Sequence, residues 1–170
     1  MPDRAPFELK PLSAEGIPRA LEKAERYRLL NEPAEAESIC RDVLRVEPGN
    51  QRALVTLLLA LTDGFDEGLA DAVPQAQLVL GQLKDEYERA YYAGIVSERR
   101  AKARLKLGGP GSGYVAYGLL REAMGHYERA EALRPTGNDD ALLRWNACAR
   151  ILDRGQLEPG PEDRSELPLE

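Results

Sequence analysis

The sequence predicts an all-α protein of about seven helices, and three observations support this class. Ala, Leu, Glu and Arg dominate the middle of the chain, and these residues lose little side-chain freedom in a helix. Apolar residues recur at spacings of three and four, and no segment alternates with a period of two. Proline and glycine separate the periodic segments at short intervals.

The predicted helices follow one another with identifiable starts and stops. Residues 1–12 contain three prolines without apolar periodicity and are predicted to form a flexible arm. Ser13 offers an N-cap, and Pro18 is tolerated in a first helical turn. Pro48 ends the second helix, and the following Gly49-Asn50 pair is expected to tolerate a positive φ. The seven helices are predicted at about residues 14–31, 33–47, 51–62, 71–84, 85–106, 114–133 and 139–152.

The ends of the second and sixth predicted helices match each other. Residues suited to close helix packing lie at the same three distances, twelve, eight and five positions, before both Pro48 and Pro135. The matched pairs are Ala36 with Ala123, Cys40 with Tyr127, and Val43 with Ala130. Together with Ala24 and Tyr27 upstream, this pattern resembles the tetratricopeptide repeat, a 34-residue pair of antiparallel helices.

The resemblance covers about residues 14–154. It implies an α-solenoid, a right-handed superhelical stack of helix pairs. About three repeats are expected, followed by a capping helix that carries Trp145. The helical repeat domain is expected over residues 13–154, followed by an acidic, disordered tail over residues 155–170. The two prolines are 87 residues apart, whereas two regular repeats would need 68. We therefore expect an extended third hairpin at about 85–133, with roughly 17 extra residues.

In this family the first helices of successive repeats line a concave groove that accepts a peptide. Carried onto this sequence, the resemblance places Leu21, Glu25, Val55 and Leu142 at inward positions, in addition to the candidates named at the end of this paragraph. Leu21 and Val55 suit the core equally well. A mixed apolar and arginine-bearing surface suits a peptide with hydrophobic anchors and some acidic character. The groove candidates are Arg28, Arg52, Leu59, Tyr91, Ile95, Glu98, Asn146 and Arg150.

Two charged segments stand out. The tail over residues 155–170 carries five carboxylates against one arginine, a net charge of -4. A run of five cations within eight residues lies on the fifth predicted helix, and it is either a solvated face or a docking site for an acidic partner or the tail. The run consists of Arg99, Arg100, Lys102, Arg104 and Lys106.

No residue pattern supports catalysis, a metal or a cofactor. Gly111–Ala116 fits a G-x-G-x-x-A dinucleotide pattern, but a helix is predicted before it where that fingerprint needs a strand. His126 is the only histidine, and a zinc site would need several further ligands. Cys40 and Cys148 lie among apolar helical residues and are expected to pack in the core.

A net charge of -6 and a pI of about 5.0 argue against nucleic-acid binding. No signal peptide is visible, and the longest apolar stretch is too short to span a bilayer, so a cytoplasmic location without membrane attachment is expected. The sequence therefore predicts a non-catalytic scaffold or adaptor that binds a protein or peptide. The alternatives are a self-assembling structural homo-oligomer and a small-ligand carrier or enzyme accessory domain.

Overall fold

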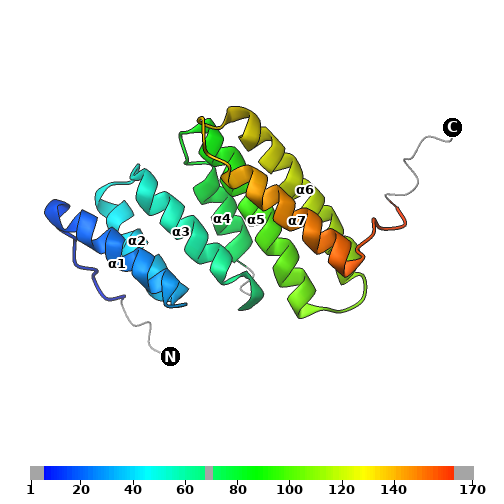
Figure 1. The fold of residues 1–170 in the computed structure, drawn as a ribbon. Helices are drawn as coiled ribbons and strands as arrows, with labels where there is room; N and C mark the ends of the chain where they lie inside the picture. The colour runs from blue at the N-terminus through cyan, green and yellow to red at the C-terminus, as the bar shows by residue number, and fades with distance from the viewer. Residues whose placement is uncertain (1–5, 68–70, 163–170) are drawn as a thin grey trace, which may run out of the picture. The chain divides into compact units, whose positions relative to one another are not determined.

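The computed structural model describes residues 6–67 and 71–162. Within these ranges the chain forms seven α-helices and no strand (Figure 1), so the predicted all-α class is confirmed. Two short 3-10 helices, η1 and η2, were not predicted. The elements in order are η1 (Ala14–Gly16), α1 (Ile17–Leu29), α2 (Pro33–Val46), α3 (Gln51–Asp63), η2 (Phe65–Glu67), α4 (Ala72–Leu80), α5 (Glu86–Leu107), α6 (Ser112–Leu133) and α7 (Asp140–Gly155).

The helix starts use the side chains that the sequence offers. The Ser13 hydroxyl accepts a hydrogen bond from the Gly16 N–H at 3.2 Å, just before α1. The Asp85 carboxylate caps α5 by accepting from the Glu88 N–H at 3.1 Å. Such caps satisfy N–H groups that have no partner within the helix.

Gly49 and Asn50 could tolerate a positive φ, but neither residue adopts one. Asn50 instead acts through its side chain, whose oxygen accepts from the Ala53 N–H at 2.9 Å. The short connection between α2 and α3 therefore serves mainly to begin the next helix.

Boundary differences of three or four residues occur at the start of α1, which η1 precedes, and at the ends of α4 and α7. α4 ends at Leu80, four residues before the predicted end, because the chain enters a turn after it. α7 continues to Gly155, three residues beyond the prediction. Gln156 then has a φ of 48°, and the Leu157 N–H donates to the Leu152 carbonyl at 3.1 Å. A left-handed residue followed by such a bond is a common way to end a helix.

The chain divides after Ala60 into two compact units. In the first unit, α1 packs against α2, and Ile17, Leu21, Val43 and Ala53 form a buried core. Leu12 packs against this core, so the end of the predicted N-terminal arm takes part in the fold. Leu21 is 2% exposed, which assigns it to the core and not to a binding surface.

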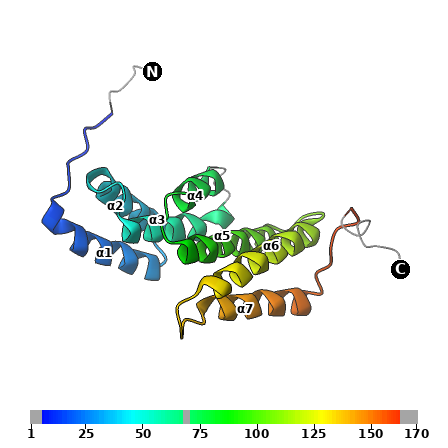
Figure 2. The ribbon, with the colours of Figure 1, turned by 90° about the horizontal axis from the view of Figure 1, so that it is seen from above.

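In the second unit, α5 and α6 form a long antiparallel hairpin, and α7 packs beside α6 (Figure 2). α5 and α6 have 22 residues each, compared with 13 and 14 in α1 and α2. Gly108, Gly109 and Gly111 join them, with φ values of 69°, 94° and 74°. Glycine adopts this left-handed region without the steric cost that other residues incur.

The closest approach in this hairpin is between Gly94 of α5 and Tyr127 of α6. A Cβ atom added at Gly94 would lie 2.4 Å from Cε1 of the Tyr127 ring. The Tyr127 side chain is fully buried. The two helices can therefore come this close only because residue 94 has no side chain.

Candidate interaction surfaces

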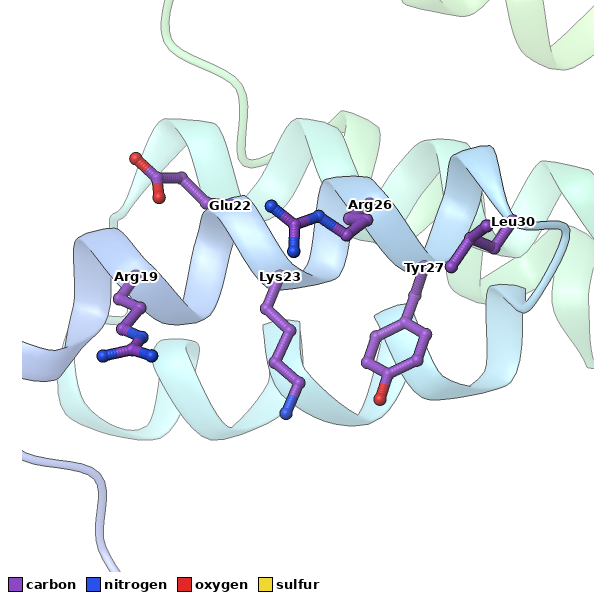
Figure 3. A pocket seen from close by; sticks show the side chains of 6 residues that line it. All are labelled: Arg19, Glu22, Lys23, Arg26, Tyr27 and Leu30. Atoms are coloured by element: carbon purple, nitrogen blue, oxygen red, sulfur yellow. The ribbon is translucent and has the colours of Figure 1, made fainter.

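The clearest hollow in the first unit lies on the exposed face of α1 (Figure 3). It has a volume of about 460 Å³. Figure 3 shows the Arg19, Lys23 and Tyr27 side chains in a row along one side of the helix. Its lining residues come from α1 and the residue that caps it: Arg19, Glu22, Lys23, Arg26, Tyr27 and Leu30.

This hollow combines positive charge with apolar area. Three cations line it against one carboxylate, Glu22. The Lys23 Nζ atom lies 5.8 Å from the centre of the Tyr27 ring, within the range of a cation–π interaction. Leu30 is 62% exposed at one end. An acidic segment with a large apolar side chain would find both kinds of partner here.

This hollow was not among the surfaces predicted from the sequence. The groove positions proposed on α1 were Leu21, Glu25 and Arg28, which lie on the opposite side of the helix at 3.6 residues per turn. The overlooked signal is the spacing of Arg19, Lys23, Arg26 and Leu30, because residues three and four apart share one helix face.

On the proposed groove side, α1 meets α3 through an ion pair. The Arg52 guanidinium donates to both Glu25 carboxylate oxygens, at 2.7 and 2.9 Å. This hydrogen bond from Arg52 is the main reason that the pKa of Glu25 lies below its ordinary value of 4.5. Arg52 thus has a partner within the chain, and the other candidates of this unit, Arg28 and Leu59, are half-buried.

In the second unit, two of the proposed groove residues are inaccessible. Ile95 and Glu98 are 3% and 0% exposed, so the prediction that they contact a partner was wrong. α6 packs along α5, and Arg144 and Cys148 of α7 contact the Glu98 carboxylate. Tyr91 and Asn146 are half-buried and Arg150 is exposed.

Glu98 instead holds a polar cluster that joins α5 to α7. The Arg144 guanidinium lies 3.2 Å from its carboxylate, and the Lys102 ammonium lies 3.3 Å from it. The Cys148 thiol donates to the same carboxylate at 3.3 Å. A buried carboxylate needs such partners, because removing a charge from water is otherwise very costly.

Tyr91 of α5 packs among three other tyrosine rings. The centre of the Tyr91 ring lies 5.9 Å from Tyr87, 5.1 Å from Tyr92 and 6.0 Å from Tyr127. The Tyr127 hydroxyl is buried without a hydrogen-bond partner among the described residues. Burial, followed by the nearby Glu98 carboxylate, raises the pKa of this hydroxyl above its usual range. These contacts give the tyrosines a packing role.

The basic run on α5 is largely paired within the chain. Arg99 pairs with Asp63 at the end of α3, and Lys106 pairs with Asp66 of η2. Lys102 pairs with Glu98, as described above. Arg99 and Lys106 of the run therefore fasten the segment around η2 to α5, a role that was not predicted for them. The other two members, Arg100 and Arg104, are half-buried.

The glycine-rich turn after α5 carries a second, smaller hollow of about 300 Å³. Its walls come from residues 109–114 and from the segment Gln156, Leu157 and Glu158. A helix precedes Gly111, so the strand that a dinucleotide fingerprint needs is replaced by α5. The first residues of the predicted tail thus lie against this turn, whereas its residues from Asp163 onward lie outside the described part.

The cysteines and the histidine are placed as the sequence suggested. Cys40 and Cys148 are buried, and burial raises the pKa of both thiols to about 12. His126 lies 3.8 Å from Glu122 on the same helix. Across residues 6–67 and 71–162, no three His, Cys, Asp or Glu side chains are grouped as a metal site would require.

Among the described helices, none has both the length and the apolar composition needed to cross a bilayer. No protein-family model, no curated protein and no solved structure matches the chain. The surfaces described above are therefore interpreted from their own geometry and chemistry.

Proposed function

We propose that the chain is a tetratricopeptide-like repeat protein that binds a protein or peptide and has no catalytic activity of its own. The matched positions before Pro48 and Pro135 support the repeat. The small residue at position 94, which admits the Tyr127 ring, fits the same pattern. In this proposal the helix pairs stack as a right-handed solenoid, in which each repeat contacts only its neighbours.

The observation that carries the binding function is the hollow on α1. Charges in a protein surface recruit an oppositely charged partner, and a buried apolar side chain then supplies most of the affinity. The hollow has three cations beside the Tyr27 ring and the exposed Leu30 side chain. We propose that its ligand is an acidic peptide with at least one large apolar side chain.

A display library of random peptides, selected on the purified full chain, tests this proposal. The selected peptides are expected to combine Asp or Glu with Leu, Phe or similar side chains. Their binding is expected to weaken by about tenfold or more in the variant Lys23→Glu/Arg26→Glu. The matched control is Arg129→Glu/Arg154→Glu, which makes the same change in net charge at exposed positions of α6 and α7.

The variant Arg150→Ala distinguishes the α1 hollow from the groove expected in the second unit. If the selected peptides bind at α1, Arg150→Ala leaves their affinity unchanged. Peptides that lose affinity in Arg150→Ala but not in Lys23→Glu/Arg26→Glu would place binding in the second unit instead. A selection without any enriched sequence would contradict peptide binding altogether.

A further inference from the structure

We infer that the occupant of the α1 hollow is the acidic C-terminal segment, residues 158–170, of a second copy of this chain. This inference rests on the proposed function, because it names the partner of the same site. It describes a head-to-tail contact in which each copy offers one hollow and one segment.

Charge complementarity is the first argument. Arg19, Lys23 and Arg26 against Glu22 give the hollow a net charge of +2. The segment has a net charge of -4, from its five carboxylates against Arg164. The pairs would form at an exposed surface, so their attraction is strongest at low salt. The carboxylates are Glu158, Glu162, Asp163, Glu166 and Glu170.

The apolar composition and the length also match. The segment has leucines at 167 and 169 between the carboxylates at 166 and 170. From Arg19 to Leu30 the helix rises about 16 Å, at 1.5 Å per residue. An extended chain covers that length with about five residues, at roughly 3.3 Å each. The stretch 166–170 is therefore long enough to lie along the whole hollow, with leucines available for Tyr27 and Leu30.

A second copy can present its segment to the hollow whatever the arrangement of the two units within one chain. The hollow belongs to the first unit, whereas the segment follows α7 of the second unit. The residue just before the segment, Leu157, lies at the glycine-rich turn, with its side chain 3.6 Å from the position of a Cβ atom added at Gly113.

The test compares the full chain with two full-length variants by light scattering over a range of concentrations. One variant, Lys23→Glu/Arg26→Glu, changes the net charge of the hollow from +2 to -2. The other, Glu166→Lys/Glu170→Lys, changes the net charge of the segment from -4 to 0. The unmodified chain is expected to gain mass with concentration at about 0.05 M salt and to lose that gain at about 0.5 M salt, because salt screens exposed charges. Each variant alone is expected to remain monomeric.

Mixing the two variants gives the decisive result. The hollow variant keeps an intact segment and the segment variant keeps an intact hollow, so together they are expected to form a dimer and nothing larger. The control Arg129→Glu/Arg154→Glu is expected to associate like the unmodified chain.

Three outcomes would overturn the inference. They are a monomeric mass for the unmodified chain at every concentration at low salt, association of either variant alone that equals that of the unmodified chain, and no dimer in the mixture. The failure of the inference is distinguishable from that of the proposed function. If library peptides bind at Lys23 and Arg26 while the chain stays monomeric, peptide binding stands and only the occupant is wrong.

Discussion

Gly94 and Tyr127 show most directly how a single residue limits this fold. The Tyr127 ring occupies the space where a Cβ atom of residue 94 would be, at 2.4 Å from the nearest ring carbon. Neither partner can move easily, because Tyr127 is fully buried and its ring also contacts Tyr91. In the first hairpin, Ala24 and Cys40 stand at the matching positions and are both fully buried.

Gly94→Ala is therefore expected to lower the free energy of unfolding by about 1–3 kcal/mol, the usual cost of overpacking a tight core. Gly118→Ala is the matched control, because a Cβ atom there meets nothing within 4 Å. That change is expected to raise stability by about 0.5–1 kcal/mol, since alanine loses less backbone entropy in a helix. Urea unfolding measures both, and equal effects of the two variants would contradict the close contact.

The Tyr127 hydroxyl leads to a second prediction. It is buried without a hydrogen-bond partner among the described residues, and such a group costs about 1–3 kcal/mol. Tyr127→Phe is expected to leave stability unchanged or to raise it, because the ring stays and the unpaired hydroxyl is removed. Tyr127→Ala is expected to cost about 3–5 kcal/mol through loss of the ring. A loss in Tyr127→Phe comparable to that in Tyr127→Ala would show that the hydroxyl is bonded.

At the scale of the helices, α7 is held to α5 by one buried carboxylate. Glu98 contacts Arg144 and Cys148 of α7 and Lys102 of its own helix. Such buried ion clusters contribute more to the specificity with which helices pair than to net stability, because desolvation offsets much of the attraction. Their removal is nonetheless costly, because the remaining charged groups lose their partner.

Glu98→Ala is expected to lower stability by about 3 kcal/mol and to speed amide hydrogen exchange in α7. Glu98→Gln is expected to cost less, because an amide oxygen can still accept from Arg144 and Cys148. The control Glu122→Ala removes an exposed carboxylate of α6 and is expected to change stability by less than about 0.5 kcal/mol. Unchanged exchange in α7 of Glu98→Ala would show that other contacts hold this helix.

The ion pair between α1 and α3 predicts a pH effect. The Arg52 guanidinium holds the pKa of Glu25 below its ordinary value of 4.5, so the pair stabilises the fold above that pH. The stabilisation is lost as the pH falls through the lowered folded-state pKa. Both side chains are nearly half exposed, so a contribution below about 1 kcal/mol is expected.

Comparison of the unmodified chain with Arg52→Ala measures this effect. The difference in unfolding free energy between them is expected to be largest near neutral pH and low salt and to shrink as the pH falls below 4.5. Glu37→Ala serves as a comparison within α2, because it removes the exposed ion pair between Glu37 and Arg41. A difference that grows toward acidic pH would have the wrong sign for this pair.

At the scale of the whole molecule, each of the two units buries apolar residues of its own. Ile17, Leu21, Val43 and Ala53 form a core within the first unit. The second unit buries its own residues along α5 and α6, including Leu120 and Ala123. In repeat proteins, stability is close to a sum over neighbouring parts, so one part can open while another stays protected.

We accordingly expect Gly94→Ala to speed hydrogen exchange in α5, α6 and α7 while exchange in α1 and α2 stays unchanged. Exchange followed by mass spectrometry on peptic fragments provides the measurement. Gly118→Ala serves again as the control and is expected to leave both units protected. Equal acceleration in both units by Gly94→Ala would show that the chain unfolds as one cooperative unit.

The sequence by itself determined the helical class, the order of the seven helices and most of their ends, because caps, breakers and apolar spacing act over a few residues. Only the tertiary structure decided which faces are covered. Glu98 is buried. Arg99 and Lys106 pair with the carboxylates of Asp63 and Asp66, which lie 36 and 40 residues earlier in the sequence. Such partners depend on how helices pack, which local spacing does not encode, and for the same reason the hollow on α1 emerged only from the structure.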